Sequence, residues 1–300
     1  MKLAVTGATG FVGGHLLDAA AASGHSVIAL TRRPQQPRTG VEWIAGSLDA
    51  RAALERLMVG ADAVIHVAGV VNAPDAAGFE AGNVIGTGAV LAAAEKAGTP
   101  RFVHVSSLAA REPLLSQYGA SKARSEALVA ASPLSTVIVR PPAIYGPDDR
   151  EMLEMFKMAA RGLVLLPPAG RLSLLHAADL ARLLLALAAA TAPTGTIEPD
   201  DGQPGGWTHR EFGAMLGQAV GRKVRLASMP RLVMTAAARA DRLLRGVKAK
   251  LTPDRAAYFC HPDWVADPAK APSSAIWTAQ IPSPSGLAET AAWYRSAGLL

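Results

Sequence analysis

The chain has 300 residues, of which 50% are apolar and 18% charged, a composition that suits a folded globular protein and excludes an intrinsically disordered one. This length is enough for one large α/β domain with a smaller lobe. The net charge of +6 is carried by arginines spread along the sequence without a basic block. The charge pattern therefore does not indicate a nucleic-acid partner, and an anionic small-molecule cofactor or substrate explains it better.

Short apolar segments alternate with helical patterns over the first half of the chain. Strands are predicted at 3–7, 26–30, 41–46, 63–69, 101–107 and 135–141, and helices at 11–23, 49–59, 83–97 and 118–131. Asp49 is the expected N-cap of its helix, while Gly24 and Gly98 follow the ends of theirs. Such alternation builds βαβ units, so we expect an α/β fold with a doubly wound parallel sheet of the Rossmann type.

The alternation weakens after about residue 145, where Pro- and Gly-rich breaks at 167–170 and 199–206 separate further helical patterns. These patterns cover 152–160, 177–190, 208–220 and 231–245. We expect residues 1–165 to form the dinucleotide-binding domain, with segments around 171–195 returning to it. Residues 166–300 are expected to form mainly a substrate-binding lobe. The segment 231–245 suits an amphipathic basic helix at a membrane, although a lobe helix with a solvated basic face is the more ordinary interpretation.

A glycine-rich segment, TGATGFVG at 6–13, joins the first strand to the first helix. Gly7 permits a sharp turn, Gly10 lets the backbone approach a diphosphate, and Gly13 lets the helix pack tightly on the strand. The anion then lies at the helix N-terminus, where free N–H groups and the helix dipole favour it. The strand–turn–helix context favours a dinucleotide site over a glycine-rich turn without a ligand.

The end of the second strand indicates which dinucleotide binds. An acidic residue there would bind a ribose 2′-hydroxyl, but the sequence instead continues with Arg32 and Arg33. An arginine suits a 2′-phosphate through charge-assisted hydrogen bonds, so NADP(H) is favoured over NAD(H). Arg32 is the stronger candidate because it is closer to the strand, and two solvated surface arginines are the alternative.

A second motif, YGASK at 118–122, places a phenol and an ammonium group on one face of a predicted helix. We expect Lys122 and a bound, positively charged nicotinamide to stabilise the phenolate of Tyr118 and to lower its pKa. Tyr118 is then a candidate for proton transfer to or from a substrate oxygen. Lys122 is expected also to hold ribose hydroxyl groups.

The two motifs, together with HVAG (66–69), NVIGT (83–87), VSS (105–107) and RPPAIYGP (140–147), resemble the extended short-chain dehydrogenase/reductase superfamily, also called the NAD-dependent epimerase/dehydratase family. The resemblance covers the first half of the chain and continues more weakly at 174–181 and 288–300. It implies that Ser107 hydrogen-bonds the reacting oxygen, with Ser106 as the alternative, that Tyr118 is the acid/base and that Lys122 is its partner. Asn83 matches an asparagine near the active site, with a helix cap as its alternative.

The resemblance also implies a set of cofactor-binding residues. In this set, the backbone at Ala68 and Gly69 runs close to the adenosine ribose and the diphosphate. The segment from Pro141 to Ile144 faces the nicotinamide. The complete set is Gly7, Thr9, Gly10, Phe11, Val12, Gly13, Arg32, Arg33, Ser47, Leu48, Ala68, Gly69, Tyr118, Lys122, Pro141 and Ile144.

Several positions depart from the family pattern. Ser47 stands where many members have an aspartate that contacts adenine, and Ala143 stands where sugar-nucleotide members often have an asparagine. The ten residues between Ser107 and Tyr118 form a shorter segment than in most sugar-nucleotide members, and no acidic residue follows Ser107 directly. These departures argue against a dehydratase and mildly against an epimerase.

The sequence thus predicts an NADP(H)-dependent oxidoreductase that reduces a ketone or aldehyde, or oxidises the alcohol, of a small apolar substrate. The Leu-, Met- and Ala-rich lobe points to the apolar substrate. An epimerase that retains its nicotinamide and a non-catalytic, cofactor-sensing regulator or assembly factor are the alternatives. The retained Tyr118 and Lys122 favour an enzyme over the regulator.

Other features bear on compartment and partners. The single cysteine, Cys260, allows no internal disulfide, and no signal peptide or membrane span is predicted, so we expect a cytoplasmic protein. The seven histidines lack metal-binding spacing, so no metal site is expected, and core positions are the preferred interpretation of His66 and His104. The expected partner is a small-molecule substrate, and a homodimer is compatible with the sequence.

Overall fold

The computed structural model describes residues 1–246, 249 and 251–300. The chain forms two compact units. The first unit comprises Met1–Pro141, Ala177–Pro199 and Lys270–Thr278. The second unit comprises Pro142–His176, Asp200–Ala269 and Ala279–Leu300. The chain therefore leaves the first unit after the sixth strand of its sheet and returns to it twice.

The first unit is built on a seven-stranded sheet with the strand order β11-β6-β5-β4-β1-β2-β3. Every neighbouring pair in this sheet is parallel. The strand order reverses at β1, which has β2 on one side and β4 on the other, so a crevice is expected at the carboxyl ends of β1 and β4. The predicted doubly wound α/β fold is confirmed. The strands are β1 (Lys2–Thr6), β2 (Ser26–Thr31), β3 (Val41–Ala45), β4 (Ala63–His66), β5 (Arg101–Val105), β6 (Ser135–Val139) and β11 (Gly195–Ile197).

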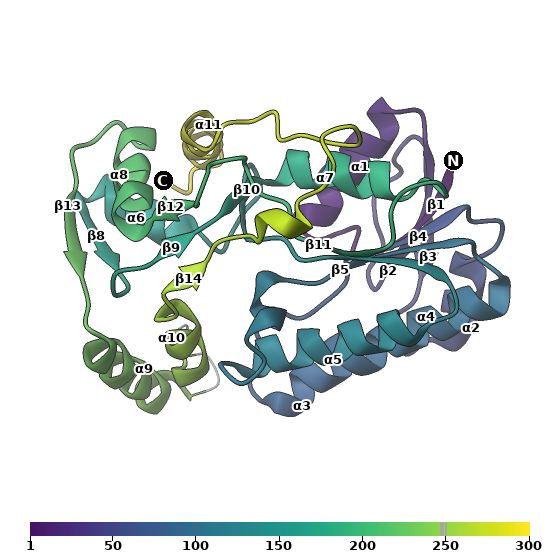
Figure 1. Ribbon diagram of the computed structural model, residues 1–300, viewed down its shortest axis with the longest axis horizontal. Helices are drawn as coiled ribbons and strands as arrows, with labels where there is room; N and C mark the ends of the chain where they lie inside the picture. Colours follow the sequence, from purple (N-terminus) through teal and green to yellow (C-terminus); the bar gives the residue numbers. More distant parts are fainter. Residues whose placement is uncertain (247–248, 250) are drawn as a thin grey trace. The chain divides into compact units, whose positions relative to one another are not determined.

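Helices cover both faces of this sheet (Figure 1). On one face, α1 (Phe11–Ala22) packs against α7 (Ala177–Leu187), and on the other α4 (Gly86–Ala97) lies between α2 (Arg51–Leu57) and α5 (Gln117–Ala131). Short helical segments precede α4 and α5: α3 (Ala76–Phe79), the π-helical turn η1 (Glu80–Ile85) and the 3₁₀ turn η2 (Leu108–Arg111). Because both faces are covered, the central strands are largely apolar, and Ala4, Val64 and Phe102 are fully buried in the core.

One expected helix start is wrong. The helix predicted at 49–59 begins only at Arg51, and Ala50 is its N-cap residue without a side-chain hydrogen bond. The carboxylate of Asp49 instead accepts a hydrogen bond from the hydroxyl of Ser47, so it is engaged two residues before the helix. The helix end predicted at Gly98 is confirmed, because Gly98 adopts the left-handed conformation that ends α4, at φ 67°.

Among the described residues, the second unit combines short strand pairs with five α-helices. Parallel pairs join β7 (Ala143–Tyr145) to β10 (Leu174–His176) and β8 (Leu163–Leu166) to β13 (Arg225–Ser228). A third small sheet has the order β12-β9-β14, formed by Trp207–Thr208, Arg171–Leu172 and Asp263–Trp264. The helices α6 (Leu153–Ala160), α8 (His209–Ala219) and α11 (Ser283–Ser296) share a core in which Phe156 and Tyr294 are fully buried.

The remaining helices, α9 (Arg231–Arg245) and α10 (Pro253–Phe259), pack against each other in the second unit (Figure 1). The helical patterns read from the sequence at 152–160, 177–190, 208–220 and 231–245 correspond to α6, α7, α8 and α9. Within the described ranges, no helix has both the length and the apolar character that crossing a bilayer requires.

Candidate functional site

The glycine-rich loop lies at the carboxyl end of β1, against the segment that leaves β4. Gly7 has a φ of +75°, and a Cβ atom there would lie 2.6 Å from the backbone nitrogen of Ala68. A Cβ atom on Gly13 would lie 2.1 Å from the carbonyl oxygen of Gly7. Only glycine therefore allows this loop to fold tightly between β1, the β4 exit and the first turn of α1.

The N-terminus of α1 has the properties of an anion site. Its N-cap residue, Gly10, makes no side-chain cap, and the first turn contains no acidic residue. Thr9 and Gly10 are exposed, and Phe11 and Val12 are partly exposed. The N–H groups of this turn and the helix dipole fit the diphosphate of a dinucleotide.

The ends of β2 and β3 carry the residues expected near the adenosine. Arg32 and Arg33 follow β2 directly and are exposed, and neither makes an ion pair among the described residues. The hydroxyl of Thr31 holds this turn by donating to the carbonyl oxygen of Arg33 at 2.7 Å. Ser47 and Leu48 follow β3 and are partly buried. The hydroxyl of Ser47 donates to Asp49, which brings a carboxylate close to the position where the family pattern has its aspartate.

Asn83 fixes the segment that follows β4. Its side-chain oxygen accepts from the backbone nitrogen of Val70 at 2.6 Å, and its amide nitrogen donates to the carbonyl oxygen of Val70 at 2.9 Å. The same amide nitrogen donates to the hydroxyl of Ser121 on α5 at 2.9 Å. Asn83 thus joins Val70, the residue after Gly69, to the helix that carries Tyr118. These bonds differ from those of a helix cap, which was the alternative considered from the sequence.

Tyr118 and Ser107 are brought together by the close approach of α5 to η2. Ser116 caps α5 by accepting from the backbone nitrogen of Gly119 at 3.0 Å. A Cβ atom on Gly119 would lie 2.6 Å from the carbonyl oxygen of Ala109, so glycine is needed for this contact. The hydroxyl groups of Tyr118 and Ser107 are hydrogen-bonded.

Burial raises the pKa of Tyr118 above its usual value of 10.0, and the hydrogen bond with Ser107 opposes this effect only in part. The sequence predicted a lowered pKa for Tyr118, caused by Lys122 and a bound nicotinamide. The chain by itself does not lower this pKa. A raised pKa keeps the phenol protonated at neutral pH, which is the form that donates a proton.

The two neighbouring serines after β5 have different partners. The hydroxyl of Ser106 donates to the carboxylate of Glu126, whereas Ser107 bonds to Tyr118 and accepts from the backbone nitrogen of Ala109 at 3.2 Å. Adjacent residues of an extended segment point to opposite sides, so only one of the two can face Tyr118. The geometry favours Ser107 over the alternative, Ser106.

Lys122 lies one helical turn after Tyr118 and is buried. Its ammonium group donates to the carbonyl oxygen of Val105, at the end of β5, at 2.8 Å. A Cβ atom built on Gly69 would lie 3.6 Å from the Nζ atom of Lys122, so the lysine also borders the β4 exit. Burial lowers the pKa of Lys122 from 10.5 to about 8, while the carboxylate of Glu126 opposes this shift.

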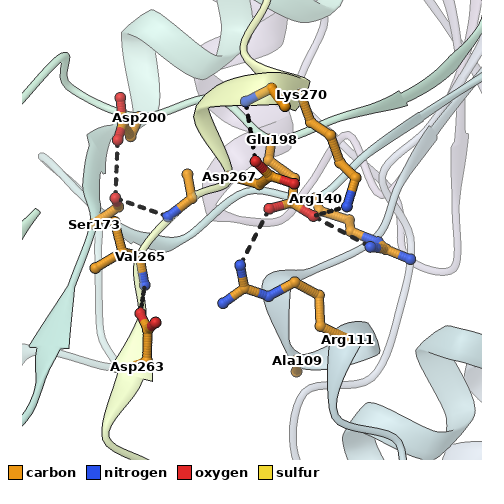
Figure 2. Close-up of polar contacts among 12 residues, drawn as sticks. Ala109, Arg111, Arg140, Ser173, Glu198, Asp200, Asp263, Val265, Asp267 and Lys270 are labelled. Carbon is orange, nitrogen blue, oxygen red and sulfur yellow. Dashed lines mark hydrogen bonds and ion pairs between the residues drawn. The ribbon is translucent and has the colours of Figure 1, made fainter. Parts of the chain in front are cut away.

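A network of ion pairs links Glu126 to further charged residues. Arg140 binds Glu126 through two hydrogen bonds, from Nε at 2.9 Å and from Nη2 at 2.6 Å. It also pairs with Glu198 at 3.2 Å, and Figure 2 shows the Glu198 carboxylate among Arg140, Arg111 and Lys270. Because Glu198 is fully buried, three cations around it offset the cost of removing its charge from water.

The first unit therefore brings most of the predicted site residues to one edge of its sheet. The glycine loop, Ala68, Gly69 and Ser107 lie at the carboxyl ends of β1, β4 and β5, and Pro141 follows β6. Ile144 lies in β7 of the second unit, where it pairs with Leu175 of β10. The sequence analysis did not identify Glu126, Arg140 or Glu198. Glu126 could have been found from its spacing, because it lies four residues after Lys122 on the same helix and therefore beside it.

Two buried histidines lie beneath this edge, at the ends of β4 and β5. His66 bonds to the hydroxyl groups of Thr6 at 2.6 Å and Thr87 at 3.0 Å, and its ring stacks on that of His104 with centroids 5.4 Å apart. Burial lowers the pKa of His66 to about 3, so the ring is neutral. Across the described part of the chain, no three His, Cys, Asp or Glu side chains form a group suited to a metal ion.

Comparison with known proteins places this chain in a family. The family model described as "NAD dependent epimerase/dehydratase family" matches residues 3–197. The ceramide reductase of Caulobacter vibrioides is 40% identical over 311 residues, covering 99% of this chain and 96% of the relative. The 4-hydroxy-2-methyl-3-oxo-4-farnesyl-3,4-dihydroquinoline-1-oxide ketoreductase of Stigmatella aurantiaca is 38% identical over 185 residues, which cover 54% of this chain and 55% of the relative.

A solved structure agrees on the fold. The Bordetella bronchiseptica enzyme WbmG in complex with NAD and UDP superposes with a TM-score of 0.76 at 21% identity, covering 99% of this chain and 96% of that one. The extent of the family match and the reductase relatives identify an NAD(P)-dependent enzyme that uses a nicotinamide cofactor. The chain belongs to the NAD-dependent epimerase/dehydratase family, within the extended short-chain dehydrogenases/reductases.

Proposed function

We propose that this chain is an NADPH-dependent ketoreductase that reduces the ketone form of a ceramide-type lipid to the corresponding alcohol. The observation that carries the proposal is the similarity to the Caulobacter ceramide reductase, which extends over 99% of this chain and 96% of the relative. Both units fall within this similarity, whereas the match to the farnesyl-quinoline ketoreductase covers 54% of the chain.

The names of the two relatives have chemistry in common. One names a ceramide, a lipid amide with long alkyl chains, and the other names a 3-oxo group on a molecule with a farnesyl chain. The two names share a reduction and a molecule with a long apolar substituent, and the second name adds the oxo group. This agrees with the apolar substrate expected from the Leu-, Met- and Ala-rich second half of the sequence.

The arrangement of Ser107, Tyr118 and Lys122 suits such a reduction. When bound, the nicotinamide supplies a hydride for the carbonyl carbon. Ser107 polarises the carbonyl group by donating a hydrogen bond to its oxygen, and Tyr118 donates the proton that completes the alcohol. Tyr118 is suited to this role because its raised pKa keeps it protonated before the reaction.

Lys122 supports both partners of the reaction. Its bond to the carbonyl oxygen of Val105 uses one of the three N–H groups of its ammonium, and the remaining donors suit ribose hydroxyl groups. Its positive charge also stabilises the phenolate that Tyr118 becomes once its proton has left. Loss of the proton from Lys122 would weaken both interactions.

NADP(H) is the proposed cofactor because of the end of β2. Arg32 and Arg33 are exposed there, and among the described residues neither is engaged by an acidic side chain. A 2′-phosphate would gain charge-assisted hydrogen bonds from a guanidinium group at this position. An NAD-type site would instead carry an acidic residue at this strand end.

The test is a reduction assay with purified protein, NADPH and a 3-oxoceramide dispersed in detergent micelles. We expect loss of NADPH absorbance and formation of the ceramide alcohol by mass spectrometry, with deuterium from C4-deuterated NADPH on the carbinol carbon. A short-chain ketone without alkyl tails serves as the control substrate and should react poorly.

The same assay separates the alternatives. Interconversion of UDP-sugars without net use of cofactor, together with no reduction of 3-oxo lipids, would establish the epimerase instead. Binding of NADPH with no turnover of any carbonyl compound, by a protein that retains Tyr118 and Lys122, would favour the regulator.

A further inference from the structure

Helix α9 presents apolar side chains to solvent along most of its length. Leu232 is 85% exposed, Leu243 is 86% exposed and Leu244 is 85% exposed. Among the described residues, only one other large apolar side chain, that of Leu114, is more than four-fifths exposed. Exposed leucines are ordinary when scattered, but three on one helix form a surface that calls for a partner.

The spacing places these side chains on one face. Leu232, Ala236, Ala240 and Leu243 follow one another at intervals of three or four residues, and Val233, Ala237 and Leu244 form a parallel row beside them. All seven are exposed. We call these seven residues the α9 apolar face.

The opposite side of α9 is held by the protein. Met234 and Ala238 are buried, and the thiol of Cys260 lies 3.5 Å from the sulfur of Met234. The carboxylate of Asp241 accepts a hydrogen bond from the backbone nitrogen of Leu251 at 3.0 Å. The helix is therefore anchored by one narrow side, and its apolar face is not the side that packs against α10.

Basic side chains line the flank between the buried side and the apolar face. Arg231, Arg239, Arg242 and Arg245 are balanced by the single acidic residue Asp241, which leaves α9 with a net charge of +3. Arg245 pairs with Asp241 at 3.2 Å, and in the described part of the chain the other three arginines make no ion pair. A partner for this helix must accept leucines and complement positive charge.

We propose that α9 docks on an anionic membrane surface, with its apolar face in the acyl–headgroup boundary and its arginines among lipid phosphates. An amphipathic helix with a basic polar flank has the composition of an interfacial helix. A second copy of this chain fits less well, because a two-fold contact would bring the arginines of one α9 against those of the other.

The direct test is flotation of the purified full-length protein with vesicles, without substrate or cofactor. We expect binding to phosphatidylglycerol-rich vesicles, weaker binding to pure phosphatidylcholine, and a decrease on raising the salt concentration. Leu232→Ser/Leu243→Ser/Leu244→Ser should lower the partition coefficient by at least about tenfold, given the value of burying each leucine. Arg239→Gln/Arg242→Gln should remove most of the preference for anionic lipid.

The matched control is Leu114→Ser, which changes a leucine outside α9 that is at least as exposed and should leave vesicle binding unchanged. A second measurement uses an environment-sensitive dye on Ala240→Cys in a Cys260→Ser background, which holds no other cysteine. Its emission should increase and shift to the blue with anionic vesicles, whereas the same dye on Ala130→Cys, at an exposed position of α5, should not respond.

Two outcomes would overturn the proposal. One is the absence of binding to anionic vesicles at low salt by folded protein. The other is a concentration-dependent dimer that the triple leucine variant abolishes while vesicle binding stays as in the wild type, because a second copy would then be the occupant. Reductase activity is measured separately, in detergent micelles. Failure of the proposed reaction would therefore not change the vesicle result, and failure to bind vesicles would not change the activity result.

Discussion

Glu126 lies one helical turn after Lys122 on α5, and its carboxylate opposes the effect of burial on the pKa of that lysine. Burial is the stronger effect and lowers the pKa to about 8, so the ammonium group is close to losing its proton in the physiological range. Glu126 is itself held in place by two hydrogen bonds from Arg140 and one from Ser106. The position of this carboxylate therefore bears on the charge of Lys122.

The first prediction concerns pH. In the wild type, kcat/KM for NADPH should fall as the pH rises past about 8, because neutral Lys122 no longer stabilises the phenolate or the ribose contacts. Glu126→Gln removes the carboxylate that keeps the lysine charged, so the falling limb should move to lower pH. Steady-state kinetics across the pH range measure both profiles.

The matched control for this experiment is Glu95→Gln, which changes an exposed carboxylate on α4 that binds the hydroxyl of Ser132. Its profile should follow that of the wild type. Profiles of Glu126→Gln and the wild type that superimpose would show that Glu126 does not act on Lys122.

The second prediction concerns proton transfer. Tyr118→Phe keeps the ring and removes the proposed donor, so turnover should fall by about 10²–10⁴-fold while NADPH affinity changes little. Isothermal calorimetry measures the affinity, and single-turnover absorbance measures the rate. Tyr258→Phe, in α10, is the control and should keep the wild-type rate. Wild-type turnover by Tyr118→Phe on a proven substrate would disprove the role.

The third prediction separates the adjacent serines. Ser107→Ala removes a hydrogen bond to the reacting oxygen and should lower kcat by about 10–100-fold, with little effect on cofactor affinity. It should also lower stability somewhat, because the backbone nitrogen of Ala109 loses its side-chain acceptor. Ser106→Ala removes the donor to the Glu126 carboxylate, so it should chiefly lower the free energy of unfolding, by about 1.5–3 kcal/mol. Urea unfolding and steady-state kinetics are measured on both variants. If Ser106→Ala lowers kcat and Ser107→Ala does not, Ser106 is the residue that bonds the reacting oxygen.

The fourth prediction concerns cofactor choice. Arg32→Ala should remove charge-assisted hydrogen bonds to the 2′-phosphate, which contribute about 1.5–3 kcal/mol, so NADP(H) should bind about 10–100-fold more weakly while NAD(H) changes little. Arg51→Ala, an exposed arginine at the start of α2, is the control. Calorimetry measures the affinities for both dinucleotides. If Arg32→Ala weakened the binding of NADP(H) and NAD(H) equally, the basis for preferring NADP(H) would be removed.

The fold of the first unit was predictable because its signals are local. Apolar strands and helix-ending glycines alternate at short range, and six of the seven strands follow from that pattern. The seventh, β11, is only three residues long and lies between prolines, too short for a periodic signal. The return of Lys270–Thr278 to the first unit was not visible either, because it depends on tertiary contacts such as the bond from the Trp277 indole to the carbonyl oxygen of Asp179.

Part of the candidate site could likewise be predicted from the sequence, and part of it could not. The glycine loop and the Tyr118–Lys122 pair are defined by spacing within a few residues, so the sequence alone indicates them. The partners of Arg140, by contrast, lie 14 residues away at Glu126 and 58 residues away at Glu198, and only the folded sheet brings them together. The four-residue spacing on a helix predicts that Glu126 lies beside Lys122. The hydrogen bonds between Glu126 and Arg140, however, depend on the pairing of β5 with β6.

The fifth prediction tests the dinucleotide site by contrasting two glycines of one loop. Gly10 has an extended backbone, at φ −88° and ψ 176°, and a Cβ atom there meets only the carbonyl oxygen of Gly7 within 4 Å, at 3.3 Å. Gly10→Val should therefore fold, yet its side chain would occupy the space in front of the α1 N-terminus, so dinucleotide affinity should be nearly lost. Gly13→Val should destabilise the protein itself, because its Cβ atom would lie 2.1 Å from that same carbonyl oxygen.

Thermal unfolding and cofactor titration on these two variants separate packing from binding. Gly10→Val should melt close to the wild type and fail to bind NADPH, whereas Gly13→Val should melt well below it. Gly14→Ala, next in the chain, has no heavy atom within 4 Å of its Cβ position and serves as the control for the helix N-terminus. Normal NADPH affinity in Gly10→Val would mean that the diphosphate lies elsewhere, since a side chain at residue 10 cannot share the space in front of α1 with it.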